Sequence, residues 1–468
     1  MKTENIEDIY ELTPIQKGIL FHSIYDTDSQ LYLFQVLYTI ESSFDMEIFE
    51  TAWQIVVDRH TILRTGFYWE EVEKELQVVY KQVKLTINHY DWGHLEKEEQ
   101  ENQLESFIAS DRSKSFDLSK PCPMRLSLIR LADDKYYLIV NSHFIINDGW
   151  TDILLTEEVV RIYAALSHNK EIPLAPAPPY KDYINWLKQK DIAKTEIFWR
   201  QALQGIKKPT SIAYLEKTQP SSIQEQRYDE EKLRLTLQET KNLKSFAIQN
   251  RLTLASIFNG IWTILLSRYT GQDEVLYGCT ANGRPVDLKG IEAMAGLFLN
   301  TLPIYVKIDV EQPLLLWLKQ IQTQLLAARR YEYTPLTDIH GWSEVPRNLN
   351  LFESVVVMED FSVKRLVEDL EMDLKIKYCK TYYKNNYPLN LVIYPDDKLF
   401  MAFSYHDTKF SLDTIKGILK DIYVTLQQLI ANPNIRIKDL SFLTSEQEQN
   451  AAILESEASF DWDFALSV

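Results

Sequence analysis

The 468-residue sequence predicts an α/β fold divided into two lobes. Both halves mix strand-like apolar runs with helical patterns of similar length, which is typical of α/β proteins. The one proline-dense stretch, residues 172–179, separates the halves. Because proline fixes φ and removes a backbone donor, this stretch is expected to be a semi-rigid linker. We therefore predict an N-terminal lobe over residues 1–175 and a C-terminal lobe over 176–468.

The first half opens with a predicted helix. Apolar residues recur at helical spacing up to Tyr25, and the pair Thr13-Pro14 marks the start, because proline is favoured in the first helical turn. The same reasoning predicts a strand over 31–40, a helix over 45–59 capped by Asp45, and paired strands over 65–90.

A buried strand followed by a turn and a helix stands out near the middle of the first lobe. Residues 135–141 form a short apolar run typical of a buried strand, and a helical pattern follows over 152–166. The turn between them carries His143, Asp148 and Gly149.

The second half repeats the alternation of helices and strands. Helices are predicted over 180–204, 252–269 and 412–432, and strands over 232–237, 274–279, 302–310, 354–357, 389–394 and 399–405.

The charge balance argues against nucleic-acid binding. Lysine and arginine number 50 and acidic residues 67, so the net charge is 50 − 67 = −17. Such a surface repels phosphate backbones, although one local basic patch could still meet an acidic carrier protein or a phosphate group.

The cysteines and the apolar runs indicate a cytoplasmic protein. Cys122, Cys279 and Cys379 are far apart and odd in number, which fits reduced thiols and argues against a disulfide framework or a zinc site. The N-terminus lacks the apolar segment of a secretory signal, and no run reaches the length of a membrane span.

Several motifs resemble those of condensation domains of nonribosomal peptide synthetases. The stretch from Leu12 to Ser23, LTPIQKGILFHS, is similar to the opening motif of members that accept a D-configured donor. Other stretches match later family motifs in order and spacing: RHTILRT at 59–65, YKDYINW at 180–186, NGRP at 282–285, GLFLNTLP at 296–303, YTPL at 333–336 and NYPL at 386–389.

The resemblance implies a fold and a reaction. Family members have two lobes similar to chloramphenicol acetyltransferase, arranged as a V with an active-site tunnel between them. They join a donor acyl thioester to an acceptor amine, and each substrate hangs on the phosphopantetheine arm of a carrier protein. We therefore expect donor and acceptor carrier proteins and neighbouring synthetase domains as partners, a monomeric chain, and no cofactor or metal bound by the chain itself.

The active-site motif of the family, HHxxxDG, is altered in this chain. Asp148, Gly149 and Trp150 set the alignment, so His143 is the first histidine and Phe144 occupies the position of the second, which the family uses for catalysis. An imidazole can orient the attacking amine and accept its proton, and a phenyl ring can do neither.

Weak activity is a better expectation than none. Loss of a positioned acid–base group costs about 10²–10⁴ in rate. Holding two tethered substrates in near-attack geometry contributes on the order of 7–11 kcal/mol by itself, and a thioester is already activated.

The rest of the motif is intact. Gly149 lies where a strand meets a helix, so backbone N–H groups and the helix N-terminus could face a developing oxyanion. In the family the motif aspartate pairs with an arginine of the second lobe, which corresponds here to Asp148 with Arg284. That pairing would be structural.

Less specific roles compete for several of these residues. His143 is expected to be structural rather than catalytic, and Arg59, His60 and Arg64 are expected to support the floor of the first lobe. Trp150, Asn300 and Thr301 are candidates for the tunnel, although Asn300 and Thr301 could equally well serve only to satisfy backbone groups.

Two functions remain open from the sequence. The first is an amide-forming condensation domain, in which Phe144 is either a natural variant that relies on another positioning group or a disabling substitution. The second is a non-catalytic module of the same fold that binds carrier proteins or recruits a tailoring enzyme. Phe144 favours the second function, and the well-kept remaining motifs favour the first.

Overall fold

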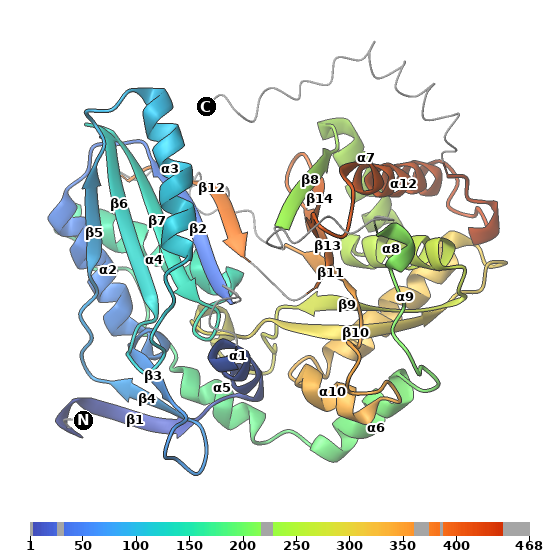
Figure 1. The fold of residues 1–468 in the computed structure, drawn as a ribbon, viewed down its shortest axis with the longest axis horizontal. Coiled ribbons are helices and arrows are strands. Elements are labelled where there is room, and N and C mark those ends of the chain that lie inside the picture. The colour runs from blue at the N-terminus through green and yellow to red at the C-terminus, as the bar shows by residue number, and fades with distance from the viewer. Residues whose placement is uncertain (1–2, 26–31, 217–227, 360–373, 384–386, 443–468) are drawn as a thin grey trace.

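The computed structural model describes residues 3–25, 32–216, 228–359, 374–383 and 387–442. Two α/β lobes lie side by side in Figure 1, each built on its own large sheet. Asn386 of the NYPL motif and the C-terminal residues 443–468 lie outside the described residues.

The first lobe is built on a five-stranded mixed sheet with helices on both faces. Its order is β12 (Ile376–Tyr383), β2 (Leu33–Ile40), β7 (Lys135–His143), β6 (Met124–Ala132) and β5 (Ile87–Asp91). Apolar side chains of α3 (Lys97–Arg112) cover one face. Those of α2 (Met46–Arg59) and α4 (Gly149–Ser167) cover the other.

A smaller sheet and two helices complete this lobe and lead to the next. The small sheet has the order β1 (Ile6–Glu11), β4 (Leu76–Tyr80) and β3 (Thr65–Tyr68). The helix α1 (Pro14–Tyr25) begins at the proline that the sequence indicated. In Figure 1, α1 and α5 (Tyr180–Leu187) lie at the base, where the lobes meet, and α6 (Ile192–Ala202) continues into the second lobe.

The second lobe is built on a six-stranded sheet that shares one apolar core with its helices. Its strand order is β10 (Asn300–Lys307), β9 (Glu274–Ala281), β11 (Ser354–Met358), β13 (Leu389–Tyr394), β14 (Phe400–His406) and β8 (Tyr228–Arg234). The helices are α7 (Leu237–Asn250), α8 (Leu254–Thr270), α9 (Leu314–Arg329), α10 (Leu336–Trp342) and α12 (Leu412–Ala431).

Two segments from the second half of the chain contribute to the first lobe. β12 pairs antiparallel with β2, so it is an edge strand of the first sheet. Five side chains of the loop between β9 and β10 belong to the core cluster of the first lobe: Ile291, Met294, Ala295, Leu297 and Phe298. The linear division at residue 175 remains an interpretation, and the chain crosses it at these two places.

Candidate functional site

The motif aspartate joins the start of α4 to the second lobe. Asp148 is the N-cap of α4, and its Oδ1 accepts a hydrogen bond from the Thr151 N–H at 2.8 Å. Its Oδ2 accepts from the backbone N–H groups of Phe298 at 3.0 Å and Leu299 at 3.3 Å. One buried carboxylate therefore caps the helix and anchors the loop before β10, which leaves it little freedom to act as a base.

Arg284 completes this anchor. Its Nη2 lies 3.6 Å from Asp148 Oδ1, the pairing that the resemblance implies, and 3.1 Å from the Thr151 hydroxyl. Its Nη1 donates to the carbonyls of Ile291 and Met294 at 2.6 and 2.7 Å. Burial lowers the pKa of Arg284, and Asp148 opposes that shift. A buried ion pair with this many hydrogen bonds holds the loop in one geometry.

Thr151 is a residue that the sequence analysis did not single out. Its Oγ1 donates to the Gly296 carbonyl at 2.7 Å and accepts from the Gly296 N–H at 3.1 Å. Gly296 has φ +155°, and a Cβ there would lie 2.4 Å from the Tyr180 ring, so only glycine fits. The spacing of Asp148 and Thr151, that of an N-cap and the third helical residue, was an available signal.

Trp150 also reaches across the lobe junction. Its indole N–H donates to the Glu292 carbonyl at 2.9 Å, and its ring lies 5.2 Å from the Arg284 guanidinium carbon. These contacts are structural, and the expected place of Trp150 in the tunnel stays a prediction.

Gly149 begins a long helix and has open space beside it. A Cβ built at Gly149 would meet no heavy atom within 4 Å, whereas most neighbouring residues of the turn are buried. As the first residue of the 19-residue α4, it lies at the positive end of the helix dipole. This arrangement could stabilise a negative oxygen without any side chain.

His143 is held in place by both ring nitrogens. Nδ1 accepts from the Ile145 N–H at 3.2 Å, so the proton belongs on Nε2, which lies 3.2 Å from Ser23 Oγ. Ser23 in turn donates to the Ile19 carbonyl at 2.8 Å. Burial lowers the pKa of His143 to about 3, so the ring is neutral near pH 7. These contacts leave no ring nitrogen for substrate.

Phe144 directly follows His143, the last residue of β7, and its side chain lies on the opposite face of the sheet from that of His143. Phe34 pairs with Ser142, and Phe144 lies two residues further on, so these three side chains share the face covered by α2 and α4. The half-buried Phe144 ring lies 5.4 Å from the Phe34 ring, edge to face. Its backbone N–H donates to the Tyr32 carbonyl at 2.8 Å.

The residues of the RHTILRT motif lie on other contacts. His60 Nε2 is 2.8 Å from Glu158 Oε2 and Arg59 Nε is 3.0 Å from the same oxygen, which joins α2 to α4. Burial raises the pKa of Glu158, but the hydrogen bonds from His60 and Arg59 outweigh it and lower the pKa overall. Arg64 binds Glu7 and the Tyr80 carbonyl. These contacts match the expected support of the lobe.

Asn300 satisfies backbone groups of its own lobe. Its Nδ2 donates to the carbonyls of Glu332 and Thr334 at 2.8 and 2.6 Å, and its Oδ1 accepts from the Thr301 N–H at 2.9 Å. The half-buried Thr301 side chain hydrogen-bonds the Tyr387 hydroxyl. Burial raises the pKa of Tyr387, and the hydrogen bond with Thr301 opposes part of this shift. The contacts of Asn300 therefore match the alternative in which it serves to satisfy backbone groups.

A buried carboxyl one turn into α4 also escaped the sequence analysis. Asp152 accepts a short hydrogen bond from the Tyr38 hydroxyl, which also accepts from Thr156 Oγ1 at 3.3 Å. Burial raises the pKa of Asp152 to about 7, and the Tyr38 hydrogen bond opposes the shift. The Tyr378 ring of β12 packs edge-on against Tyr38 at 6.3 Å.

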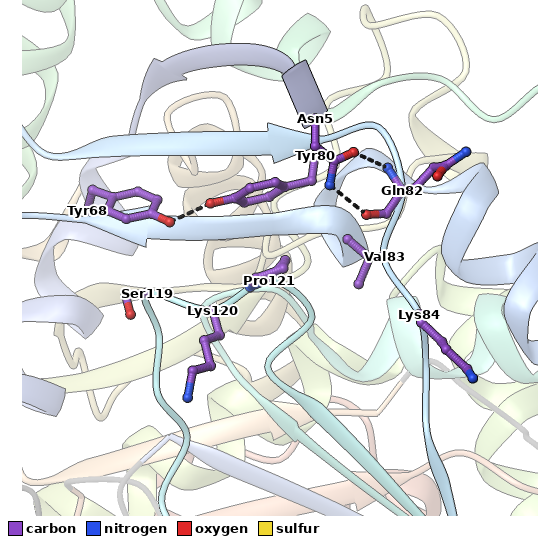
Figure 2. Close-up of a pocket in the computed structure, with 9 residues that line it drawn as sticks. All are labelled: Asn5, Tyr68, Tyr80, Gln82, Val83, Lys84, Ser119, Lys120 and Pro121. Carbon is purple, nitrogen blue, oxygen red and sulfur yellow. Dashed lines mark hydrogen bonds between the residues drawn. The ribbon is translucent and has the colours of Figure 1, made fainter. Parts of the chain in front are cut away.

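A surface pocket lies on the small sheet, away from these residues. Figure 2 shows the hydroxyls of Tyr68 and Tyr80 in contact above the loop that carries Ser119 and Lys120. None of the predicted site residues lines this pocket. In the described part of the chain, no three His, Cys, Asp or Glu side chains gather in a way that could hold a metal ion. No described helix is both long and apolar enough to cross a membrane.

The fold matches solved structures over nearly its whole length. The starter condensation domain of rhizomide synthetase superposes with a TM-score of 0.77 at 18% identity, covering 93% of this chain and 98% of that chain. The X-domain from teicoplanin biosynthesis gives 0.76 at 21% identity, covering 95% and 99%. These matches confirm the predicted mixed α/β fold of two acetyltransferase-like lobes.

Sequence relatives give the same family. The model of the condensation domain matches residues 6–452, so the chain belongs to the condensation-domain family of nonribosomal peptide synthetases, which form amide bonds. One linear gramicidin synthase protein of Brevibacillus parabrevis is 36% identical over 467 residues, and another is 38% identical over 454. These alignments cover 100% and 97% of this chain but only 6% and 9% of the two relatives. Condensation domains work within synthetase modules, beside carrier-protein domains.

Proposed function

We propose that this chain is an amide-forming condensation domain whose rate is lowered by Phe144. A donor acyl thioester and an acceptor amine, each on the phosphopantetheine arm of a carrier protein, would meet between the lobes at the end of β7. The chain would act as a monomer, beside neighbouring synthetase domains and without nucleic acid. The single observation that carries the proposal is Phe144 at the end of β7, in a motif that otherwise keeps its contacts.

The aromatic ring explains the lowered rate. The second position of the motif lies in the turn directly after β7, before α4 begins, on the opposite face from the neutral His143. Phe144 occupies this position, and its phenyl ring has no lone pair with which to accept a proton. Asp148 is committed to the helix cap and to Arg284, and both nitrogens of His143 are engaged. No motif residue therefore takes over the role of proton acceptor.

What remains is stabilisation of charge and proximity. The open space at Gly149 and the N-terminus of α4 support an oxyanion site that does not depend on Phe144. Two tethered substrates would still be held close together, so slow condensation of the activated thioester is expected.

We also propose a D-configured donor. The motif that suggests it, Leu12 to Ser23, covers most of α1, and two of its residues bond to the altered motif. Gln16 Nε2 donates to the Ile145 carbonyl at 3.0 Å, and Ser23 Oγ lies 3.2 Å from His143. Changes in this helix would therefore be transmitted to the residues that flank Phe144.

A second candidate is a non-catalytic binding module. Phe144 favours it, and so does the fold match with the X-domain from teicoplanin biosynthesis, which has also been solved in complex with OxyB. In this case the chain would recruit a carrier protein or a tailoring enzyme without making a bond.

Restoring a base separates the two candidates. The native chain, Phe144→His and the matched control Phe144→Leu are compared with loaded donor and acceptor carrier proteins, and amide product and carrier binding are measured separately. If the chain is a condensation domain, the native chain should form the amide slowly. Phe144→His should form it about 10²–10⁴-fold faster, and Phe144→Leu should show no gain in rate. Absence of product in all three chains, with carrier binding retained, would favour the binding module.

A further inference from the structure

Among the described residues, no strand covers the edge of β12 that lies opposite β2. β12 is the last strand of the first sheet, and within the described residues only β2 pairs with it. Residues 377–380 in its middle are exposed. A sheet edge of this kind presents backbone N–H and C=O groups that can accept another extended chain.

The register shows which backbone groups point outward. The Glu41 N–H donates to the Lys375 carbonyl at 3.0 Å, so Lys375 faces β2. Backbone groups alternate in direction along an antiparallel strand, so those of Ile376 and Tyr378 point away from β2. The irregularity of pairing follows Tyr378 and does not affect these two residues.

One end of this edge lies at the altered motif. Tyr383, the last residue of β12, pairs with Phe34, and the Phe34 ring contacts the Phe144 ring at 5.4 Å. β12 and β7 are both antiparallel to β2, so they run in the same direction and both end at the site. From Tyr383 back to Ile376 the edge extends about 23 Å, at about 3.3 Å per residue.

The outer side of β12 faces the second lobe. In Figure 1 the strand lies on the side of the first sheet that faces the second lobe, with β8 opposite it. The Tyr378 side chain is 39% exposed, yet the protein around its hydroxyl removes enough water to raise its pKa to about 12, and smaller contributions come from the carboxylates of Glu359 and Glu230, both from the second lobe. The edge is therefore sheltered between the lobes and leads to the position where the donor thioester would react.

We propose that the edge of β12 opposite β2, uncovered among the described residues, binds the peptidyl chain of the donor substrate as an added β-strand. This inference rests on the proposed condensation function. Main-chain hydrogen bonds to Ile376 and Tyr378 would hold an extended peptide whatever its side chains, with its thioester end toward Phe144. Such a site serves a long peptidyl donor, because a single aminoacyl group at Phe144 does not reach back to Tyr378.

Backbone-methylated probes test the proposal. Two hexapeptidyl-pantetheine thioesters of one composition, alternating valine and alanine, carry N-methyl groups either on residues 1, 3 and 5 or on residues 2, 4 and 6. An added strand directs alternate N–H groups to its neighbour, so only one series loses its hydrogen bonds. We expect its Kd for the native chain to be about 5- to 100-fold weaker than that of the other series. If methylation weakened the binding of the two methylated peptides equally, the proposal would be overturned.

Amide hydrogen exchange locates the edge. The unmethylated hexapeptide should slow exchange of the Ile376 and Tyr378 N–H groups at least about tenfold, whereas an acetyl-pantetheine control should not. Slowing at Glu230 and Lys232 of β8 instead, or at neither strand, would contradict the proposal. These are binding measurements, so they are independent of turnover. A condensation assay with a single-residue donor and Phe144→His tests the proposed function separately.

Discussion

Thr151 and Gly296 exchange two hydrogen bonds across the lobe junction, both made by one hydroxyl. Thr151 belongs to the first turn of α4, and Gly296 belongs to the loop that enters the first lobe from the second. The same hydroxyl accepts from Arg284, so one small side chain links the helix, the loop and the buried ion pair.

Removing this hydroxyl should destabilise the junction. Thr151→Val keeps the shape, removes the hydroxyl that binds both Gly296 backbone groups and takes away one hydrogen bond of Arg284. We expect a loss of about 1–3 kcal/mol in the free energy of unfolding, measured by urea denaturation. Thr151→Ser keeps the hydroxyl and should lose much less. Equal stabilities for the two variants would show that the hydrogen bonds contribute little.

The ion pair of Asp148 and Arg284 should be more costly to break than to replace. Asp148→Ala leaves a buried guanidinium unpaired and removes the helix cap, so a loss of about 3–5 kcal/mol is expected. The double variant with Arg284→Met should recover part of it. A double-mutant cycle with additive losses would mean that the two side chains do not interact.

Asp152 should make stability fall as pH rises. Its pKa is about 7 in the folded chain and ordinary in the unfolded chain. The folded state therefore holds the proton more tightly than the unfolded state. This contribution to the free energy of unfolding is complete below about pH 4. It is lost as the pH rises to about 7, at about 1.4 kcal/mol per pH unit. Asp152→Asn lacks this loss, so its stability relative to the native chain should improve from pH 4 to 7. A constant difference would contradict the raised pKa.

His143 should act in the opposite direction. Its pKa is about 3 in the folded chain, so the unfolded chain alone takes up a proton below about pH 6.5. Stability is complete above that pH and falls as the solution becomes more acidic. His143→Gln can keep both hydrogen bonds without titrating. The free energy of unfolding, measured at about pH 7, 5.5 and 4.5, should fall less in His143→Gln than in the native chain as the pH is lowered. An equal fall in both chains would exclude a neutral buried ring.

Local signals made the motif region predictable. The apolar run before His143 and the helical pattern that follows the turn are both encoded within about thirty residues, and the structure has β7, a turn and α4 there. The helix start at Pro14 and the cap Asp45 were predicted for the same reason. The pairing of Asp148 with Arg284 came from the family resemblance, because nothing local connects residues so far apart.

Contacts between distant segments were not predictable in this way. Residues 376–383 were not identified as a strand, because a mixed pattern of lysine and tyrosine fits an exposed edge and does not specify a sheet. The helix α3 was not identified either, because its first residues from Lys97 to Glu101 are mostly charged and exposed, and the helix buries few apolar side chains, among them Leu104 and Ile108. Glu158 was missed since its partners, Arg59 and His60, lie a hundred residues away.

The central claim is that an aromatic ring occupies the place of the base. It is tested most directly by single-turnover amide formation from preloaded carriers, followed across about pH 6–8.5 in the native chain and in Phe144→His. We predict that the variant is at least about a hundredfold faster and that its pH profile shows the ionisation of the new imidazole in addition to that of the acceptor amine, which both chains share. Equal rates and identical pH profiles in the two chains would contradict this account.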